Sequence, residues 1–230
     1  MKTVLITGAN RGIGFEFSRQ YAAEGWRVFA CSRRPSQEIG KLAEKHPGLV
    51  ENPLLDVSDR DRIEQLGRTL SGEPIDLLIS NAGIYPDSGS RGFGHTDYGK
   101  WMEAFSVNTM ATLKLAETFI EQVSRSTLKT IAVVTSKMGS ISDNTGGSDY
   151  LYRSSKAAVN MVVKSLSIDL GPLGITAVLL HPGWVKTDMG GPGALISVEE
   201  SVSGMKRVIA GLSIGDSGKF IGYDGKTVPW

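Results

Sequence analysis

The sequence predicts an α/β protein in which a single domain, residues 1–230, is built around a doubly wound parallel sheet with helices on both faces. Two observations predict this fold. Apolar, β-branched runs of strand length recur along the chain, and segments with a helical pattern of apolar residues separate them. Some runs, such as residues 75–79, are almost continuously hydrophobic, which is typical of a strand whose sheet is covered by helices on both faces.

The expected elements alternate along the chain. Strands are expected at residues 3–7, 27–32, 49–55, 75–80, 130–135 and 175–180. Helices are expected at residues 12–24, 36–45, 58–70, 98–125, 150–170 and 197–212. Ser58 is suited to cap the third helix, Gly171 and Pro172 end the fifth, and Ser197 with Glu200 forms a capping box for the last. Glycine-rich loops of the same domain are expected at residues 88–94, 140–148 and 190–193.

Composition narrows the range of functions. The chain has 25 Lys and Arg against 24 Asp and Glu and no long basic block, so we expect no nucleic-acid partner. No apolar run is long enough to span a bilayer and no signal peptide is visible, which leads us to expect a cytoplasmic protein without a membrane partner. Cys31 is the only cysteine, and His46, His95 and His181 lack metal-ligand spacing, so neither a disulfide nor a metal site is expected.

A glycine-rich turn follows the first expected strand. Gly8 permits a tight turn, Gly12 lets the backbone approach a pyrophosphate, and Gly14 lets the next helix pack closely on the sheet. The amino end of that helix then offers free amides to phosphate groups. The spacing differs from the commoner Gly-x-Gly-x-x-Gly, and a purely structural glycine turn is the alternative.

The end of the second expected strand indicates which dinucleotide fits. An NAD-selective protein usually has a carboxylate there for the ribose hydroxyl, whereas this chain has Ser32 and Arg33. Together with Arg11 in the glycine turn, these side chains are suited to a ribose 2′-phosphate. The interpretation favours NADP(H); a solvated loop formed by Arg33 and Arg34 is the alternative.

Tyr152 and Lys156 stand one helical turn apart on the fifth expected helix. A phenol beside an ammonium group can give a proton to a carbonyl that receives hydride, so the pair indicates nicotinamide redox chemistry. The spacing also arises by chance in many helices. The spacing indicates redox chemistry here because the glycine-rich turn occurs in the same chain.

These motifs, in this order, resemble the short-chain dehydrogenase/reductase family, and most of all its C-factor and sniffer-like carbonyl reductase branch. The resemblance runs nearly end to end. The matching segments are TGANRGIG at residues 7–14, Asp56 with Val57, Ser80 to Gly83, Val107 with Asn108, Thr135 with Ser136, Tyr152 with Lys156, and HPGWVKTD at residues 181–188.

The resemblance implies a Rossmann fold with a sheet of about seven strands in the order 3-2-1-4-5-6-7. It also implies an NADPH-dependent enzyme that reduces a ketone or aldehyde, assembled as a homodimer or homotetramer. Ser136 is implied to hydrogen-bond the substrate oxygen and Tyr152 to donate the proton. Lys156 is implied to hold the nicotinamide ribose and lower the pKa of Tyr152, and Asn108 to anchor a water that leads protons to Lys156.

The same resemblance implies a set of cofactor contacts. These are Gly8, Asn10, Arg11, Gly12, Ile13, Gly14, Ser32, Arg33, Asp56, Val57, Asn81, Ala82, Gly83, Tyr152, Lys156, Pro182, Gly183, Val185 and Thr187. Residues 182–187 are implied to form a loop around the nicotinamide. Residues 189–193 are expected to form either a mobile lid over the substrate or a plain surface loop.

Lowering the pKa of Tyr152 from about 10 toward neutrality requires about 4 kcal/mol, and a single ammonium at ~4 Å in a medium of effective dielectric near 20 supplies ~4 kcal/mol. The spacing from Ser136 to Tyr152 exceeds the usual one of the family, which makes Ser140 the rival of Ser136. Asn108 also has an ordinary interpretation as a satisfied polar residue.

A function of another class remains open. The resemblance to C-factor also fits a dinucleotide-binding signalling or regulatory protein in which turnover is incidental. The presence of all four catalytic residue types favours the enzyme, because a sensor needs no proton donor.

Overall fold

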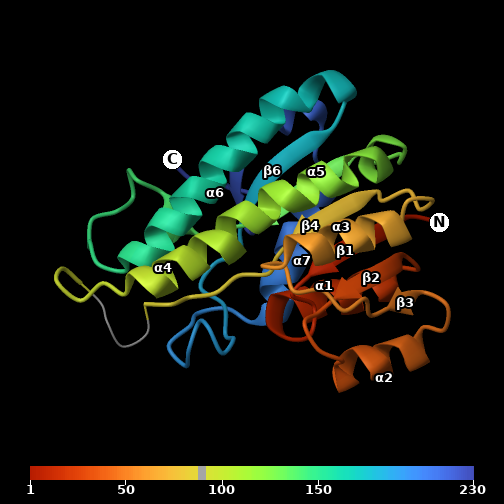
Figure 1. Ribbon diagram of the computed structural model, residues 1–230, viewed down its shortest axis with the longest axis horizontal. Helices are drawn as coiled ribbons and strands as arrows, with labels where there is room; N and C mark the ends of the chain where they lie inside the picture. The colour runs from red at the N-terminus through yellow and green to blue at the C-terminus, as the bar shows by residue number, and fades with distance from the viewer. Residues whose placement is uncertain (88–91) are drawn as a thin grey trace.

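The computed structural model describes residues 1–87 and 92–230, so positions 88–91 of the expected loop 88–94 lie outside the described residues. Parallel strands form one seven-stranded sheet in the order β3-β2-β1-β4-β5-β6-β7 (Figure 1). The strands are β1 Thr3–Thr7, β2 Arg27–Cys31, β3 Val50–Glu51, β4 Leu77–Ser80, β5 Thr130–Val134, β6 Thr176–His181 and β7 Phe220–Gly222. The predicted parallel sheet and the strand order implied by the resemblance are confirmed.

Helices cover both faces of this sheet, as Figure 1 shows. They are α1 Gly12–Ala23, α2 Gln37–Lys45, α3 Arg60–Thr69, α4 Tyr98–Phe105, α5 Ala111–Ser124, α6 Tyr150–Asp169 and α7 Val198–Ala210. Successive strand residues point to opposite faces and therefore join different halves of the core. In β1, Leu5 packs with apolar residues of α3, α5 and α6, whereas Val4 and Ile6 pack with those of α1, α2 and α7.

The strand expected at residues 49–55 is much shorter in the structure. Only Val50–Glu51 forms β3, and an isolated parallel bridge joins Ser32 to Leu54 beyond it. Pro53 lies between these two pairings and has no amide hydrogen to donate to a ladder. The seventh strand, Phe220–Gly222, had no counterpart among the strands expected from the sequence pattern, because three residues are too few to show a period.

The long helix expected at residues 98–125 is interrupted. A π-helical segment, Ser106–Met110, separates α4 from α5 and contains Asn108. A π-helical turn accommodates one extra residue, so the sequence positions that form a given helix face are shifted by one residue across it. On the α4 side Trp101 donates a hydrogen bond to the Ser154 hydroxyl of α6 at 2.8 Å, while on the α5 side Phe119 is fully buried in the core.

The helix caps correct one expectation and confirm another. Asp59, rather than Ser58, caps α3: its carboxylate accepts a hydrogen bond from the Arg62 amide at 3.1 Å. Ser58 instead donates to Asp56 through both its amide and its hydroxyl. The cap at the start of α7 is confirmed, because the Ser197 hydroxyl accepts from the Glu200 amide at 3.0 Å.

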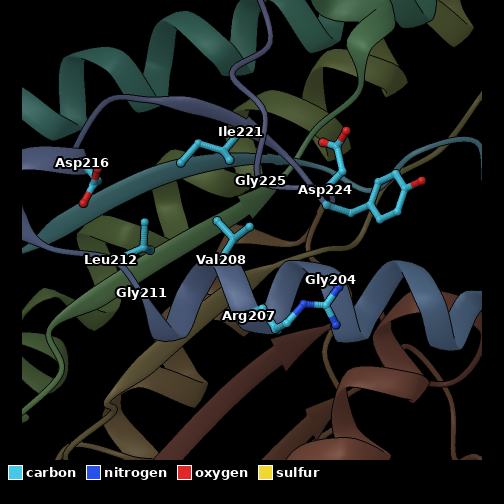
Figure 2. Close-up of a pocket in the computed structure, with 10 residues that line it drawn as sticks. Gly204, Arg207, Val208, Gly211, Leu212, Asp216, Ile221, Asp224 and Gly225 are labelled. Atoms are coloured by element: carbon cyan, nitrogen blue, oxygen red, sulfur yellow. The ribbon is translucent and has the colours of Figure 1, made fainter.

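Helix α7 lies close to the turn that follows β7. A Cβ placed on Gly204 would stand 2.3 Å from the Tyr223 carbonyl oxygen, so only glycine permits this approach. Figure 2 shows α7, with Gly204 and Arg207, below the segment that carries Ile221 and Asp224. A pocket of about 330 Å³ lies between them and contains none of the predicted site residues.

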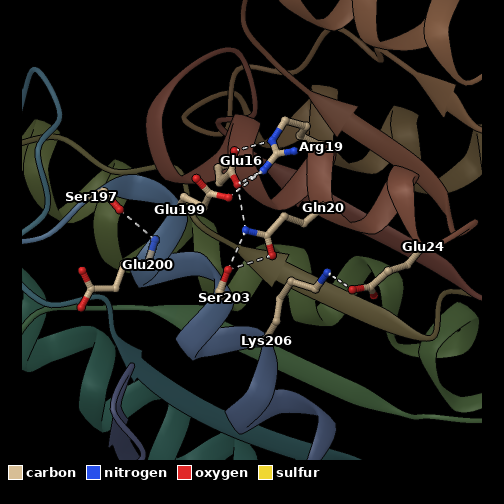
Figure 3. A network of polar contacts seen from close by, with 9 residues as sticks. All are labelled: Glu16, Arg19, Gln20, Glu24, Ser197, Glu199, Glu200, Ser203 and Lys206. Atoms are coloured by element: carbon tan, nitrogen blue, oxygen red, sulfur yellow. Dashed lines mark hydrogen bonds and ion pairs between the residues drawn. The ribbon is translucent and has the colours of Figure 1, made fainter.

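Polar contacts join α7 to α1 on the same face of the sheet (Figure 3). The Gln20 amide donates to Glu16 of its own helix at 2.8 Å and to Ser203 of α7 at 3.1 Å. The buried Lys206 ammonium forms an ion pair with Glu24 at 2.7 Å. Burial raises the pKa of Glu16, but hydrogen bonds from Arg19 and Gln20 outweigh it and hold the pKa below its usual value.

Within residues 1–87 and 92–230, no helix is both long and apolar enough to cross a membrane. In the same part of the chain, no three His, Cys, Asp or Glu side chains lie together in a way that suits a metal ion. Cys31 is buried on β2, and burial raises the pKa of its thiol.

Candidate active site

Helix α6 places Tyr152 and Lys156 beside the carboxyl end of β5. Both side chains are buried, with exposed fractions of 8% and 5%. The Lys156 ammonium donates a hydrogen bond to the Val134 carbonyl at 3.1 Å and lies 5.7 Å from the centre of the Tyr152 ring. The structure thus brings the predicted phenol and ammonium together next to the sheet.

Ser136 and Ser140 have different surroundings. Ser136 hydrogen-bonds with the Tyr152 phenol, and its hydroxyl also accepts from the Met138 amide at 3.1 Å. Ser140 is buried and caps its own turn, accepting from the Asp143 amide at 3.2 Å. Of the two serines, the geometry places Ser136 at the phenol.

Burial controls the ionisation of both groups on α6. It raises the pKa of Tyr152 to about 12, and the hydrogen bond with Ser136 acts in the opposite direction. It also lowers the pKa of Lys156 to about 8. We expected the ammonium to lower the pKa of Tyr152, and the structure gives the opposite direction. The reason is that burial disfavours both charged forms, while the ammonium is directed at the Val134 carbonyl.

Asn108 is held in place by its amide. Its Oδ1 accepts from the Ile84 amide at 2.8 Å, and its Nδ2 donates to the Ile84 carbonyl and to the Ser155 hydroxyl, each at 3.0 Å. Ser155 in turn donates to the Tyr152 carbonyl at 2.8 Å. A Cβ on Gly83 would lie 3.2 Å from the Asn108 Oδ1 and 3.6 Å from the Lys156 Nζ, so both groups flank this glycine.

Several residues that hold Ser136 were not identified from the sequence. A Cβ on Gly139 would lie only 2.7 Å from the carbonyl carbon of Lys156, so the turn after Ser136 packs directly on the backbone of α6. Asn160 donates to the Gly139 carbonyl at 3.3 Å and accepts from Thr135 at 2.7 Å. His181 accepts from the Lys137 amide at 3.2 Å.

His181 keeps its imidazole neutral in this position. Burial, reinforced by the Lys137 ammonium, lowers its pKa to about 4. Its Nδ1 therefore stays an acceptor for the Lys137 amide at neutral pH. This histidine supports the turn and is not a metal ligand in the described part of the chain.

The glycine turn between β1 and α1 has the geometry of a backbone cradle. Gly8 and Gly12 have positive φ angles of 66° and 53°. A Cβ on Gly8 would lie 2.9 Å from the Ala82 Cα, and one on Gly14 would lie 2.3 Å from the Gly8 carbonyl oxygen. Arg11 precedes α1 with extended backbone and gives the helix no side-chain cap, so the first amides of α1 face outward from the turn.

Thr7 connects this turn to the end of β4. Its hydroxyl accepts from the amides of Asn81 and Ala82 at 3.0 and 3.1 Å. The Asn81 side chain donates back to the Thr7 carbonyl at 2.9 Å. The predicted residues Asn81, Ala82 and Gly83 therefore border the glycine turn at the carboxyl edge of the sheet, where ligands of such folds bind.

The predicted cofactor residues after β2 and β3 differ in exposure to solvent. Ser32 is buried, and its hydroxyl donates to the Arg34 carbonyl at 2.7 Å and accepts from Asn52 at 2.9 Å. Arg33 is exposed. Burial raises the pKa of Asp56, but hydrogen bonds from Ser58 outweigh it and hold the pKa below its usual value. Val57 is buried beside Asp56, and the Arg33 guanidinium is near enough to Asp56 to help lower its pKa.

The loop after β6 folds back over the glycine turn. Val185 is buried and pairs with Ile196, and the Thr187 hydroxyl accepts from the Gly190 amide at 3.1 Å. A Cβ on Gly12 would lie 3.3 Å from the Thr187 Cγ2. Arg11 forms an ion pair with Asp188, so its guanidinium contacts this loop rather than the end of β2. Pro182 is buried, and Gly183 has a positive φ of 84°.

These features fit a dinucleotide. The crowded glycines leave backbone exposed where a pyrophosphate would approach, the amino end of α1 is uncapped, and the end of β2 carries Arg33 in place of a carboxylate. A second pocket, of about 780 Å³, lies along α4 beside Trp101 and Met110 and does not include Tyr152. From the sequence we also predict that residues 84–98, 138–150 and 184–196 form the walls of the substrate pocket; residues 88–91 of the first range lie outside the described residues.

Comparisons with known proteins agree with this geometry. The family model for short chain dehydrogenases matches residues 2–193. The C-signal protein of Myxococcus xanthus is 47% identical over 158 residues, which cover 68% of this chain and 93% of that protein. The chain therefore belongs to the short-chain dehydrogenase family.

Solved structures resemble the whole chain. The NADPH-bound carbonyl reductase from chicken fatty liver has a TM-score of 0.91 and 37% sequence identity, covering 100% of this chain and 99% of that one. The carbonyl reductase Sniffer of D. melanogaster has a TM-score of 0.92 and 31% identity, covering 100% of both chains.

Replacing Gly139 with alanine tests the contact between the Ser136 turn and α6. The added methyl group would press on the α6 backbone, and we expect the free energy of unfolding to fall by about 1–3 kcal/mol. Gly146→Ala is the matched control, because no atom lies within 4 Å of its Cβ position. Thermal unfolding of both variants measures the difference; equal stability of the two would contradict the close approach.

Proposed function

We propose that this protein is an NADPH-dependent oxidoreductase that reduces the carbonyl group of a ketone or aldehyde, with Tyr152 as the proton donor. The observation that carries the proposal is the buried Tyr152 phenol, hydrogen-bonded with Ser136 and one helical turn from Lys156. Two structural neighbours are described as carbonyl reductases, and one of them binds NADPH. Both resemble this chain over its full length.

Tyr152 and Ser136 would act on the carbonyl oxygen. With a pKa of about 12, the phenol keeps its proton at neutral pH and is able to give it to that oxygen. The Ser136 hydroxyl donates a second hydrogen bond to the same oxygen, where negative charge develops. When bound, NADPH supplies the hydride to the carbonyl carbon, so the products are an alcohol and the oxidised dinucleotide.

Lys156 would stabilise the phenolate that remains. Its pKa of about 8 leaves it mostly charged at neutral pH, and it lies 5.7 Å from the phenol ring. Asn108 would then act through Ser155, which it contacts directly. The proton would return to Tyr152 by way of Lys156, whose Nζ lies beside Gly83, just after β4.

The residues proposed to hold NADPH lie along the carboxyl edge of the sheet. The glycine turn and the start of α1 would hold the pyrophosphate, and Arg33 with Ser32 the ribose 2′-phosphate. Asp56, Val57 and residues 81–83 border the adenine side, and Lys156 the nicotinamide ribose. The 182–187 loop would close over the nicotinamide; its hydrogen bonds within residues 184–190 support a folded loop there.

The location and assembly are part of the proposal. We propose that the protein is cytoplasmic and forms a homodimer or homotetramer. Exposed apolar residues support the assembly: Met102 on α4, Met110 in the π-helical segment and Met161 on α6. The mass of the particle in solution, from light scattering, tests the assembly.

A second candidate follows from the similarity to C-signal. In it, the chain binds a dinucleotide as a signalling or regulatory protein and turnover is incidental. Restoration of a deletion phenotype by the Tyr152→Phe protein would favour this candidate, whereas failure to restore it favours the enzyme.

Replacing Tyr152 with phenylalanine removes the proposed acid. We expect carbonyl reduction to fall by about 10²–10⁴-fold while NADPH binding, measured by fluorescence, is retained. Ser165→Ala, which removes a hydroxyl at an exposed position of the same helix, is the control and should keep full activity. The proposal fails if the two variants turn over a panel of aldehydes and ketones equally well.

The pH dependence of reduction should follow Lys156. Tyr152 stays protonated until pH about 12, whereas Lys156 loses its charge as the pH rises through about 8. We therefore expect kcat/KM for reduction to be level below pH 8 and to decrease above it. Lys164→Ala, an exposed change on the same helix, should leave the profile in place. A profile that is flat up to pH 10 would show that the Lys156 charge is not needed.

Arg33 should determine the preference between the two dinucleotides. Arg33→Ala removes a charge-assisted contact to the 2′-phosphate, so KM for NADPH should rise about 10- to 100-fold while KM for NADH stays the same. Arg62→Ala, an exposed change on α3, is the control. Equal effects on the two dinucleotides would argue against a phosphate contact at Arg33.

A further inference from the structure

The catalytic helix α6 is capped by a residue from another segment. Asp149 precedes α6 in a left-handed conformation, with φ 50° and ψ 41°, and its side chain makes no cap hydrogen bond to the helix. The carboxylate of Asp87 takes that place: it accepts from the Tyr152 amide at 2.8 Å and from the Leu151 amide at 3.3 Å. Asp87 is only 2% exposed.

The same short segment also contacts the side chain of Tyr152. The Tyr85 hydroxyl donates to the Asp149 carboxylate at 2.6 Å. The Tyr85 ring meets the Tyr152 ring edge to face, with 4.9 Å between ring centres and 64° between planes. Tyr85 therefore contacts the ring of Tyr152, and Asp87 holds its backbone amide.

The physical chemistry of a buried carboxylate makes this contact specific. A charged group that leaves water needs hydrogen-bond donors in return, and the donors of Asp87 are the first amides of α6. Those amides carry the positive end of the helix dipole and have no partner within the helix. The carboxylate and the helix start thus stabilise each other, and moving either one moves Tyr152.

We propose that Asp87 is a positioning residue for Tyr152, a proposal that rests on the proposed role of Tyr152 as proton donor. One of the two amides that Asp87 holds belongs to Tyr152 itself, so the carboxylate fixes the point from which the phenol projects. Proton transfer depends on sub-ångström placement, and a displacement of ~1 Å can cost about 10²-fold in rate. Asp87 touches neither the carbonyl nor the dinucleotide in this proposal.

The test compares Asp87→Ala and Asp87→Asn with the wild type in carbonyl reduction. We expect Asp87→Ala to lower kcat by about 10- to 100-fold with NADPH binding unchanged. Asp87→Asn keeps a side-chain oxygen that is able to accept from the Tyr152 amide, so it should recover most of the lost kcat. Unchanged kcat in both variants overturns the proposal.

Asp59→Ala is the matched control. Asp59 caps α3 in the same way, through the Arg62 amide, and lies outside the proposed machinery. Loss of this cap should lower the melting temperature as loss of Asp87 does, yet leave kcat intact. Equal losses of kcat in the Asp59 and Asp87 variants would show a general effect of stability and would overturn the positioning role. If Asp87→Ala does not fold, amide exchange in Asp87→Asn and Asp59→Asn takes its place, because the neutral Asn oxygen accepts a weaker hydrogen bond than a carboxylate.

Amide hydrogen exchange separates this proposal from the proposed function. Exchange at Leu151 and Tyr152 reports the contact with Asp87 whether or not any carbonyl is reduced. Faster exchange at these two amides in Asp87→Asn, but not in Asp59→Asn, supports the positioning contact even if the wild type shows no turnover. Unchanged exchange overturns it, whereas an inactive wild type overturns only the proposed function.

Discussion

Helix α6 approaches the end of β5 so closely that Gly139 leaves no space for a side chain, and this backbone contact sets the distance between Ser136 and Tyr152. Three hydrogen bonds around the site hold this turn and α6 in place. Asn160 holds the Gly139 carbonyl from α6, His181 holds the following turn from β6, and the Lys156 ammonium reaches the Val134 carbonyl. Each of these bonds crosses between elements far apart in the sequence, so the site exists only in the assembled sheet.

The electrostatics of the site result from the same packing. Because α6 lies against the sheet, Tyr152 and Lys156 are both withdrawn from water, and burial pushes each toward its neutral form. The phenol consequently holds its proton at neutral pH, whereas the lysine stays mostly charged there and loses its charge as the pH rises through about 8. This is the protonation state in which the proposed reduction begins, with a proton on the donor and a positive charge beside it.

The sheet was predicted well from the sequence, whereas the contacts between its strands, helices and loops were predicted less well. The resemblance to the family implied the strand order, and the pair Tyr152 and Lys156 was found from its spacing. The pattern did not reveal the π-helical segment, because one extra residue barely changes the apolar period. Nor did it reveal Gly139 or the capping of α6 by Asp87, because both depend on distances between segments that no local pattern encodes. The direction of the pKa shift of Tyr152 was missed for a similar reason: burial cannot be read from the residue types alone.

The π-helical segment makes the length of its helix as important as its composition. A residue advances an α-helix by about 100°, and the π-helical turn Ser106–Met110 already absorbs one residue, so a further residue inserted there would rotate α4 against α5 by roughly that angle. Trp101 would then leave Ser154, or Phe119 would leave the core. A substitution along this helix changes one side chain, whereas a further insertion here displaces a whole helix face. Natural or engineered variation in this part of the chain is therefore constrained in length far more tightly than in residue type.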